Sequence, residues 1–174
     1  SAITSGETKL LLQPFQPKSL VNSSVFNIAD SYNKGEANKN LTYVGDTKVV
    51  DFSPYKGGSH GSFFSDGTGD YISIPSLNAN IGTGNFTIEF WVYLKDTTAG
   101  TFFNSTSGLL YDIRASDDAS LLQTNLSGTI TNKASGNVQT SNLNKWVHHA
   151  IVRNGTDVKI YENGIQSGSG TISE

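Results

Sequence analysis

Two aspartates in a glycine-rich turn are the first side chains of this sequence that could bind a metal ion. Asp66 and Asp70 flank Gly67-Thr68-Gly69, and carboxylate oxygens on such a turn are the hard ligands that calcium prefers. A tight turn explains the same residues, because an aspartate side chain often accepts a hydrogen bond from the backbone of its own turn. We favour the turn, and a calcium site at Asp66 and Asp70 is the alternative.

A second acidic segment spans residues 112–119. Asp112 lies inside a predicted strand, and Asp117 and Asp118 lie in the polar turn that follows it. Surface loops often carry binding residues. We therefore predict that Asp112, Asp117 and Asp118 contribute to a ligand-binding loop, and metal binding by the Asp117-Asp118 pair is a weaker hypothesis.

The strand predicted over residues 86–94 offers a different kind of chemistry. Alternate residues divide between two faces of a strand, so one face here is apolar and belongs to a core. The other face carries Thr87, Glu89, Trp91 and Tyr93. A pyranose ring lies well on an aromatic ring, so Trp91 and Tyr93 are candidates for sugar stacking. The alternative is that a loop or a partner covers them.

The sequence lacks the residue patterns that several kinds of enzymatic catalysis require. Glycoside hydrolysis needs two carboxylates about 5–9 Å apart, yet Glu89 is flanked two positions away by Thr87 and Trp91. His148 and His149 are adjacent on a predicted strand and point to opposite faces, so we expect one to be buried and hydrogen-bonded and the other to face outward. No nucleophile elbow, phosphate loop or metalloprotease helix occurs. We predict that the protein is not an enzyme.

Length and composition indicate one all-β domain. For 174 residues a single domain is expected, and we predict an N-terminal arm over 1–7 and the domain over 8–174. Charged residues make up 16%, against about 25% in an average soluble domain. The 12 Lys and Arg residues are scattered, which argues against a nucleic-acid partner. No apolar run reaches the roughly 20 residues of a membrane span, so no membrane insertion is expected, and there is no cysteine.

Turn signals in the first half of the chain predict short strands. Residues 8–13 form a strand that Pro14 ends, and a polar loop follows over 19–39. Two further pairs of strands surround turns: 41–44 and 48–52 around Gly45-Asp46, and 61–64 and 71–74 around the turn that holds Asp66 and Asp70.

The second half reads as an antiparallel meander. The predicted strands after residue 94 are 101–103, 109–114, 121–126, 129–132, 146–153 and 158–161. Asn154-Gly155 and Asn163-Gly164 each predict a hairpin with a type I′ turn, in which both central residues need a positive φ.

Three segments in this order resemble a known family. They are residues 63–75, 84–92 and 146–164, and they are similar to the laminin G-like/concanavalin A-like domains of bacterial and phage proteins. The resemblance covers residues 8–172 and implies a jelly-roll β-sandwich of two antiparallel sheets. It also implies an adhesion or glycan-binding role, often beside a calcium ion. Family members usually continue into a final strand, which we expect to be absent here or supplied by a neighbouring chain through an open edge.

The resemblance leads to one function with two alternatives. We expect a non-enzymatic adhesion or glycan-binding module on a virion, in a tail fibre or on the capsid surface, or on a cell-surface protein. Its localisation would be the virion surface or outside the cell. The alternative is a purely structural virion subunit, a capsid decoration or fibre protein that binds neighbouring chains or forms a homo-oligomer. A glycan hydrolase is the least favoured hypothesis.

Overall fold

The structure is a computed structural model in which every element of the described residues is a strand. It describes residues 42–55, 61–73, 83–96, 100–105, 108–114, 119–126, 129–137 and 142–173, and the backbone of 12–15 and 24–27. The chain divides into two compact units, residues 1–80 and 81–174, which are described separately below. The single domain over 8–174 stays a prediction.

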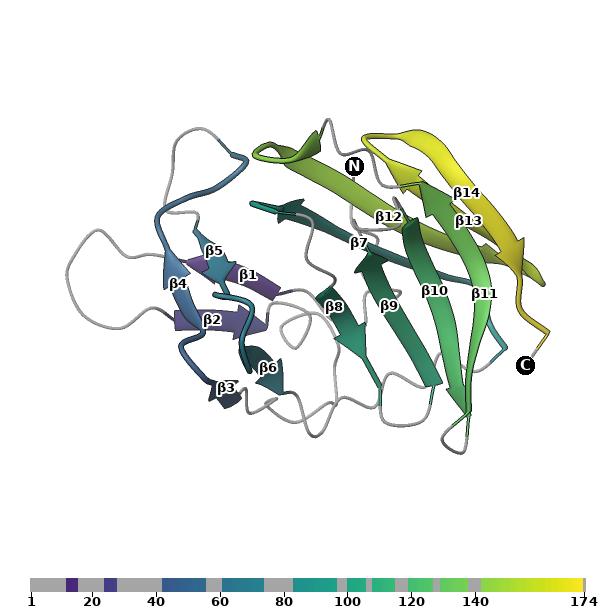
Figure 1. The fold of residues 1–174 in the computed structure, drawn as a ribbon, viewed down its shortest axis with the longest axis horizontal. Helices are drawn as coiled ribbons and strands as arrows, with labels where there is room; N and C mark the ends of the chain where they lie inside the picture. Colours follow the sequence, from purple (N-terminus) through teal and green to yellow (C-terminus); the bar gives the residue numbers. More distant parts are fainter. Residues whose placement is uncertain are drawn as a thin grey trace. The chain divides into compact units, whose positions relative to one another are not determined.

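The first unit contains six short strands in the described residues, joined as three antiparallel pairs (Figure 1). The pairs are β1 (Leu12–Phe15) with β2 (Ser24–Asn27), β3 (Thr42–Val44) with β6 (Tyr71–Ser73), and β4 (Lys48–Val50) with β5 (Ser62–Phe64).

Two predictions for the start of the chain are wrong. β1 runs through Pro14, which pairs with Val25, so Pro14 does not end the strand. Proline has no N–H to donate, but the strand belongs to a two-stranded sheet in its described part, and such an edge position tolerates it. The pairing partner β2 lies in the segment that was predicted as a loop. Residues 8–11 lie outside the described part.

The predicted pairing of the next four strands is also wrong. β3 and β4 flank the Gly45-Asp46 turn but do not pair with each other, and β5 and β6 behave in the same way. The Thr47 hydroxyl donates to the Val44 carbonyl at 2.7 Å, which closes the turn locally. The chain therefore forms β3–β6 and β4–β5 pairs, because a turn signal fixes the bend of the chain but not the partner of each arm.

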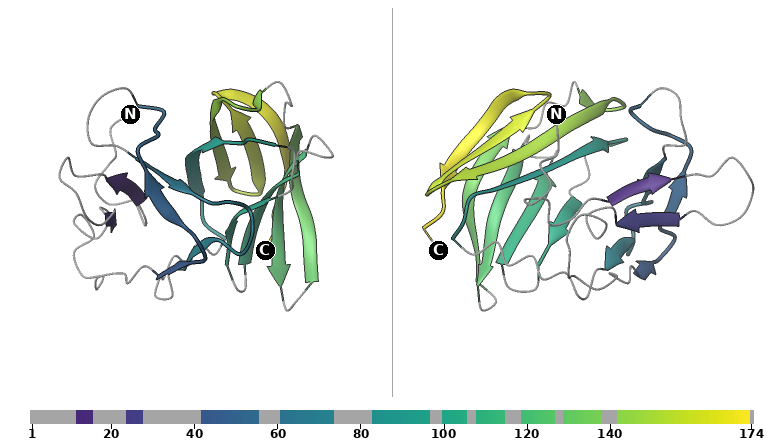
Figure 2. Two further views of the ribbon diagram at one scale, coloured as in Figure 1. Left: turned by 60° about the vertical axis from the view of Figure 1, so that its left-hand side comes forward. Right: turned by 180° about the vertical axis from the view of Figure 1, so that it is seen from behind.

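The described residues of the second unit form one antiparallel sheet of eight strands in the order β7-β12-β13-β14-β11-β10-β9-β8. The sheet curls so that β7, β12 and β13 lie opposite β8, β9 and β10 (Figure 2). This arrangement confirms the predicted antiparallel β-sandwich. The strands are β7 (Phe86–Tyr93), β8 (Gly100–Asn104), β9 (Gly108–Arg114), β10 (Ala119–Leu126), β11 (Thr129–Asn137), β12 (Trp146–Asn154), β13 (Asp157–Glu162) and β14 (Ile165–Thr171).

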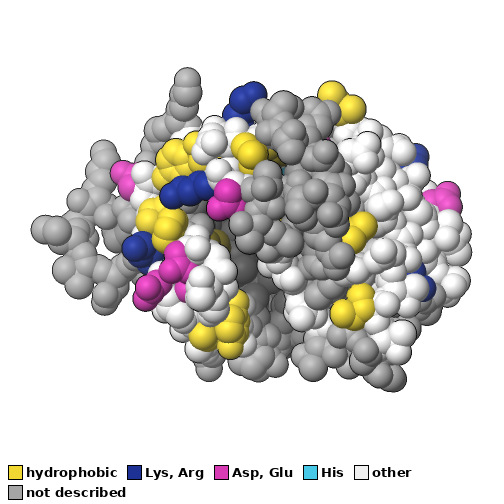
Figure 3. Space-filling view, viewed as in Figure 1, with side chains coloured by type: hydrophobic (Ala, Val, Ile, Leu, Met, Phe, Trp, Pro, Cys, Tyr) yellow, Lys and Arg dark blue, Asp and Glu magenta, His cyan; other side chains and the backbone are white. Residues whose placement is uncertain are grey.

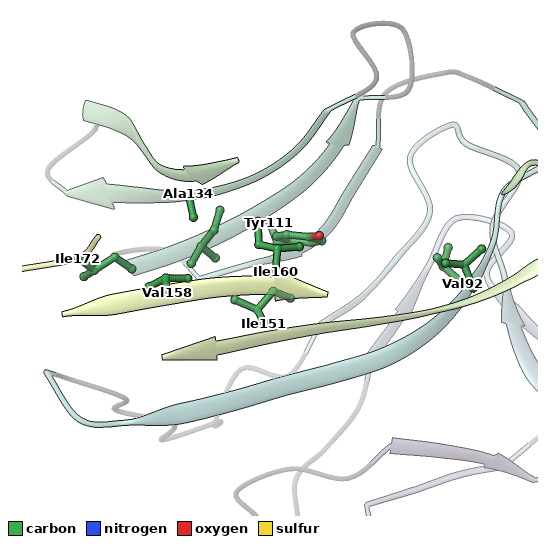
Figure 4. Packing of buried hydrophobic residues seen from close by; sticks show 9 residues of the cluster. Val92, Tyr111, Ala134, Ile151, Val158, Ile160 and Ile172 are labelled. Carbon is green, nitrogen blue, oxygen red and sulfur yellow. The ribbon is translucent and has the colours of Figure 1, made fainter. Parts of the chain in front are cut away.

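The core of this unit lies between the two opposed layers (Figure 4). Ile151 of β12 and Ile160 of β13 are completely buried and are cross-strand partners. Burying such a side chain contributes about 1.5–3 kcal/mol. Phe90 of β7 joins the layers, because its ring lies 5.4 Å from Phe102 and 6.0 Å from Tyr111, between centroids.

The backbones of β14 and β11 approach each other closely, and two glycines on β14 permit this approach. Gly168 pairs with Gly136, and Gly170 pairs with Ala134. A Cβ atom on Gly168 would meet the Ser135 carbonyl, and one on Gly170 would meet the Lys133 carbonyl. The backbones of the two strands therefore approach too closely for any side chain at these positions.

Both predicted hairpins form, but only one has the predicted turn. Asn163 and Gly164 have φ values of 49° and 80° and connect the paired residues Glu162 and Ile165, as a type I′ turn requires. In the other hairpin Asn154 pairs with Asp157, and only Gly155 has a positive φ, 62°. Asn154 belongs to the strand, so the type I′ prediction is wrong there.

Candidate functional site

The outward face of β7 and β12 gathers the aromatic side chains that the sequence singled out. The alternation of β7 directs Phe90 and Val92 to the core and Trp91 to the surface, where 41% of Trp91 is exposed. We call the group of Glu89, Trp91, Tyr93, Trp146 and His148 the outer strip. Its residues come from two adjacent strands.

Cross-strand pairing holds the rings of the outer strip together. β7 and β12 pair antiparallel, with Tyr93 opposite Trp146 and Trp91 opposite His148. The Tyr93 and Trp146 rings meet edge to face at 5.5 Å, and the Trp91 and His148 rings lie 5.1 Å apart at a tilt of 59°. Aromatic pairs of this kind stabilise a sheet and hold their rings in fixed positions.

Glu89 and His148 add polar groups to the outer strip. The His148 Nε2 and Glu89 Oε2 atoms are 3.6 Å apart, and the two side chains are 27% and 59% exposed. The backbone N–H of His148 donates to Asn163 Oδ1 at 3.0 Å, and the N–H of Asn163 donates to the His148 carbonyl at 2.8 Å. These bonds fix the backbone of His148 against the β13–β14 turn.

A buried polar cluster lies on the inner side of the same strands. His149 is 1% exposed, its ring stacks on Phe90 at 5.6 Å, and its Nδ1 lies 3.4 Å from the Tyr111 hydroxyl. The prediction of one buried and one outward histidine is therefore confirmed. Burial lowers the pKa of His149 to about 4, and the neighbouring His148 acts in the same direction. Burial also raises the pKa of Tyr111 to about 12, and the Glu162 carboxylate adds to this. At neutral pH both His149 and Tyr111 are uncharged.

The Asp66 and Asp70 carboxylates bind backbone amides, as the turn interpretation predicts. Asp66 Oδ1 accepts the Thr68 N–H at 2.8 Å within its own turn. Asp70 accepts the Asp66 N–H at 2.7 Å and the Asp46 N–H at 2.6 Å, and so joins the β5–β6 and β3–β4 turns. The Asp66 N–H bond is the main cause of the lowered pKa of Asp70. In the described residues no group of three or more His, Cys, Asp or Glu could hold a metal.

We expect Asp70→Asn to expose the amides of Asp46 and Asp66 to faster hydrogen exchange. An amide side chain has one acceptor oxygen instead of two and no charge, so it cannot serve both donors equally. Asp66→Asn is the matched control, because its Oδ1 can still accept the Thr68 N–H. The contribution of Asp70 is fully present above the ordinary aspartate pKa of 3.8 and is lost as the pH falls through the lowered pKa that Asp70 has in the folded protein.

A thermal melt of the same variant with and without calcium tests the alternative hypothesis of a calcium site. If calcium raised the melting temperature of the unchanged protein, and if Asp70→Asn removed that rise, the calcium hypothesis at Asp66 and Asp70 would replace the account of a hydrogen-bonded turn.

The structure describes only part of the acidic segment over residues 112–119. Asp112 lies in β9, opposite Leu121 of β10 and Thr101 of β8, and only its backbone is described. Asp117 and Asp118 lie outside the described residues. A ligand-binding role for these three aspartates stays a prediction.

The outer strip contains residues whose place the sequence did not indicate. Trp146 lies half-buried on the outward face beside Tyr93. Glu89 is exposed and lies beside His148. Both contacts depend on the register in which β12 pairs with β7. The residue pattern within either strand does not predict that register.

The Lys and Arg side chains of the described residues stand apart on the face seen in Figure 3, in keeping with a formal net charge of −3. No helix among the described residues is long and apolar enough to cross a membrane.

Comparisons with known proteins identify the family. Residues 66–174 match the concanavalin A-like lectin/glucanases superfamily, and the chain belongs to that family. Among solved structures it is similar to the carbohydrate binding module CBM66 from Bacillus subtilis, with 21% identity and a TM-score of 0.51 over 78% of this chain and 81% of that chain. This likeness supports the concanavalin A-like β-sandwich fold. A comparison with curated proteins finds no match.

Proposed function

We propose that this protein is a non-enzymatic carbohydrate-binding module that binds glycans on its outer strip. The observation that carries the proposal is the cluster of Trp91, Tyr93 and Trp146 on one outward face, beside the polar groups of Glu89 and His148. Sugars present apolar C–H faces and hydroxyl edges. The strip supplies rings for the faces and a carboxylate and an imidazole for the hydroxyls.

The comparisons support the same function. The superfamily includes lectins by its description, and the similar structure from Bacillus subtilis is described as a carbohydrate binding module. The outer strip gives this chain residues of its own for such a role.

The residues around Glu89 support glycan binding without catalysis. The residue opposite Glu89 on β12 is Ala150, and Ala150 is opposite Tyr161 on β13. Neither is a carboxylate, so this row of the sheet lacks the second acid that glycoside hydrolysis requires.

The proposed setting is a surface that meets glycans, on a virion or outside a cell, with adhesion as the role. A low share of charged residues and a chain without cysteine suit an all-β surface module that needs no disulfide.

We expect Trp91→Ala to weaken glycan binding about thirty-fold. Loss of an exposed anchoring ring costs about 2 kcal/mol at a binding hot spot. Binding would be measured by affinity electrophoresis in gels that contain a neutral β-glucan, mannan, galactan or fructan. Tyr71→Ala is the matched control, because Tyr71 is a 57% exposed ring outside the strip.

Retardation by one of these polysaccharides, lost in Trp91→Ala and kept in Tyr71→Ala, is the expected result. Equal retardation of Trp91→Ala and the unchanged protein would place the site elsewhere. No retardation by any of the polysaccharides would contradict the proposed function.

A further inference from the structure

A carboxylate lies among the rings of the outer strip. Glu89 and Trp91 are two positions apart on β7 and share its outward face, so their backbones are about 7 Å apart. The Glu89 side chain is 59% exposed, and a sugar ring stacked on Trp91 would have this carboxylate at its edge.

In the described strands, the row of the sheet that contains Glu89 has no Lys or Arg on β12 or β13. Across the sheet from Glu89 stand Ala150 and Tyr161, and Trp91 and His148 form the neighbouring row. The nearest cation in the register on β13 is Lys159, which pairs with Val152 opposite Thr87. Two strand spacings and one two-residue step separate the backbones of Glu89 and Lys159 by about 12 Å, so Lys159 does not lie beside Glu89 in the register.

We infer that the outer strip selects neutral glycans and discriminates against acidic ones through Glu89, an inference that rests on the proposed function. A neutral sugar can donate a hydroxyl hydrogen to the carboxylate, which is a charge-assisted hydrogen bond. A uronic acid brings a second negative charge to the same place, where it cannot donate and is repelled. At a half-exposed site we expect an affinity difference of about ten-fold.

The test compares one polymer in two charge states. The neutral polysaccharide that retards the protein in the electrophoresis experiment is compared with the same polymer after oxidation of its C6 hydroxyls to carboxylates. Dissociation constants are measured at about pH 8, where imidazole side chains are ordinarily neutral, and at low salt, where the effect of charge is largest.

Two variants locate the source of the discrimination. Glu89→Gln keeps the shape and removes the charge, so we expect the two polymers to bind it within about two-fold of each other. Asp157→Asn removes a carboxylate from β13 that is four residues from Tyr161 and outside the strip, so the ten-fold ratio should remain.

The outcomes separate this inference from the proposed function. Equal affinities for the neutral and oxidised polymers in the unchanged protein, or a ten-fold ratio that persists in Glu89→Gln, would overturn the inference and leave glycan binding intact. Absence of binding to every polysaccharide would overturn both. A ten-fold preference that Glu89→Gln abolishes and Asp157→Asn preserves is the expected result.

Discussion

Gly170→Ala is expected to destabilise the sandwich by about 3 kcal/mol or more. A methyl group at this position would meet the Lys133 carbonyl and, at 2.6 Å, the Ala134 Cα. Both are backbone atoms of β11, so no side-chain rotation relieves the clash, and β14 would have to leave its partner. Urea unfolding monitored by circular dichroism would measure the loss of stability.

The control for this prediction is Gly100→Ala. A Cβ on Gly100 of β8 would meet nothing within 4 Å, so the same change should alter the free energy of unfolding by less than about 0.5 kcal/mol. If both variants unfolded at the same urea concentration, the pairing of β14 with β11 would not require a glycine at position 170.

Acid is expected to weaken the protein between about pH 6.5 and pH 4 because of His149. The folded protein holds this imidazole with a pKa of about 4, while in the unfolded chain a histidine has a pKa near 6.5. Within that window the unfolded state binds one more proton, so the free energy of unfolding falls by about 1.4 kcal/mol for each pH unit. The whole effect is on the order of 3 kcal/mol.

Urea unfolding at about pH 7.5 and about pH 4.5 would measure this fall in the free energy of unfolding. The variant His149→Gln is the comparison. Glutamine can still bond with the Tyr111 hydroxyl but does not titrate, so its stability should depend much less on pH in this window. Asp70 does not contribute to this pH dependence. The pKa of its carboxylate is lowered from 3.8, so Asp70 takes up a proton only at a pH below the two that are compared. An unchanged slope in His149→Gln would refute the assignment to His149.

The period of β7 made its two faces predictable from sequence. Strict alternation requires Phe90 and Val92 to share one side and Trp91 and Tyr93 the other, and the burial of Val92 and exposure of Trp91 follow that pattern. The same rule separated His148 from His149. These inferences are local, because they need only the conformation of one strand.

Features that depend on register were not predictable in this way. Trp146 joins the outer strip because β12 pairs with β7 so that Trp146 faces Tyr93, a contact between segments far apart in the chain. Likewise, the turns beside β3 and β5 look like hairpin turns, yet Asp70 accepts amides from both turns and the arms pair across them. Turn chemistry is local, whereas the choice of partner belongs to the whole sheet.

The most direct test of glycan binding at the outer strip uses the two tryptophans of the chain. Trp91 and Trp146 both lie in the strip, so the two indole N–H signals in a ¹H–¹⁵N spectrum report on it alone. On titration with the polysaccharide fragment that binds, we predict that the Trp91 signal shifts most, that the Trp146 signal shifts with it, and that both shifts saturate together. A glycan that binds while both indole signals stay in place would contradict the account.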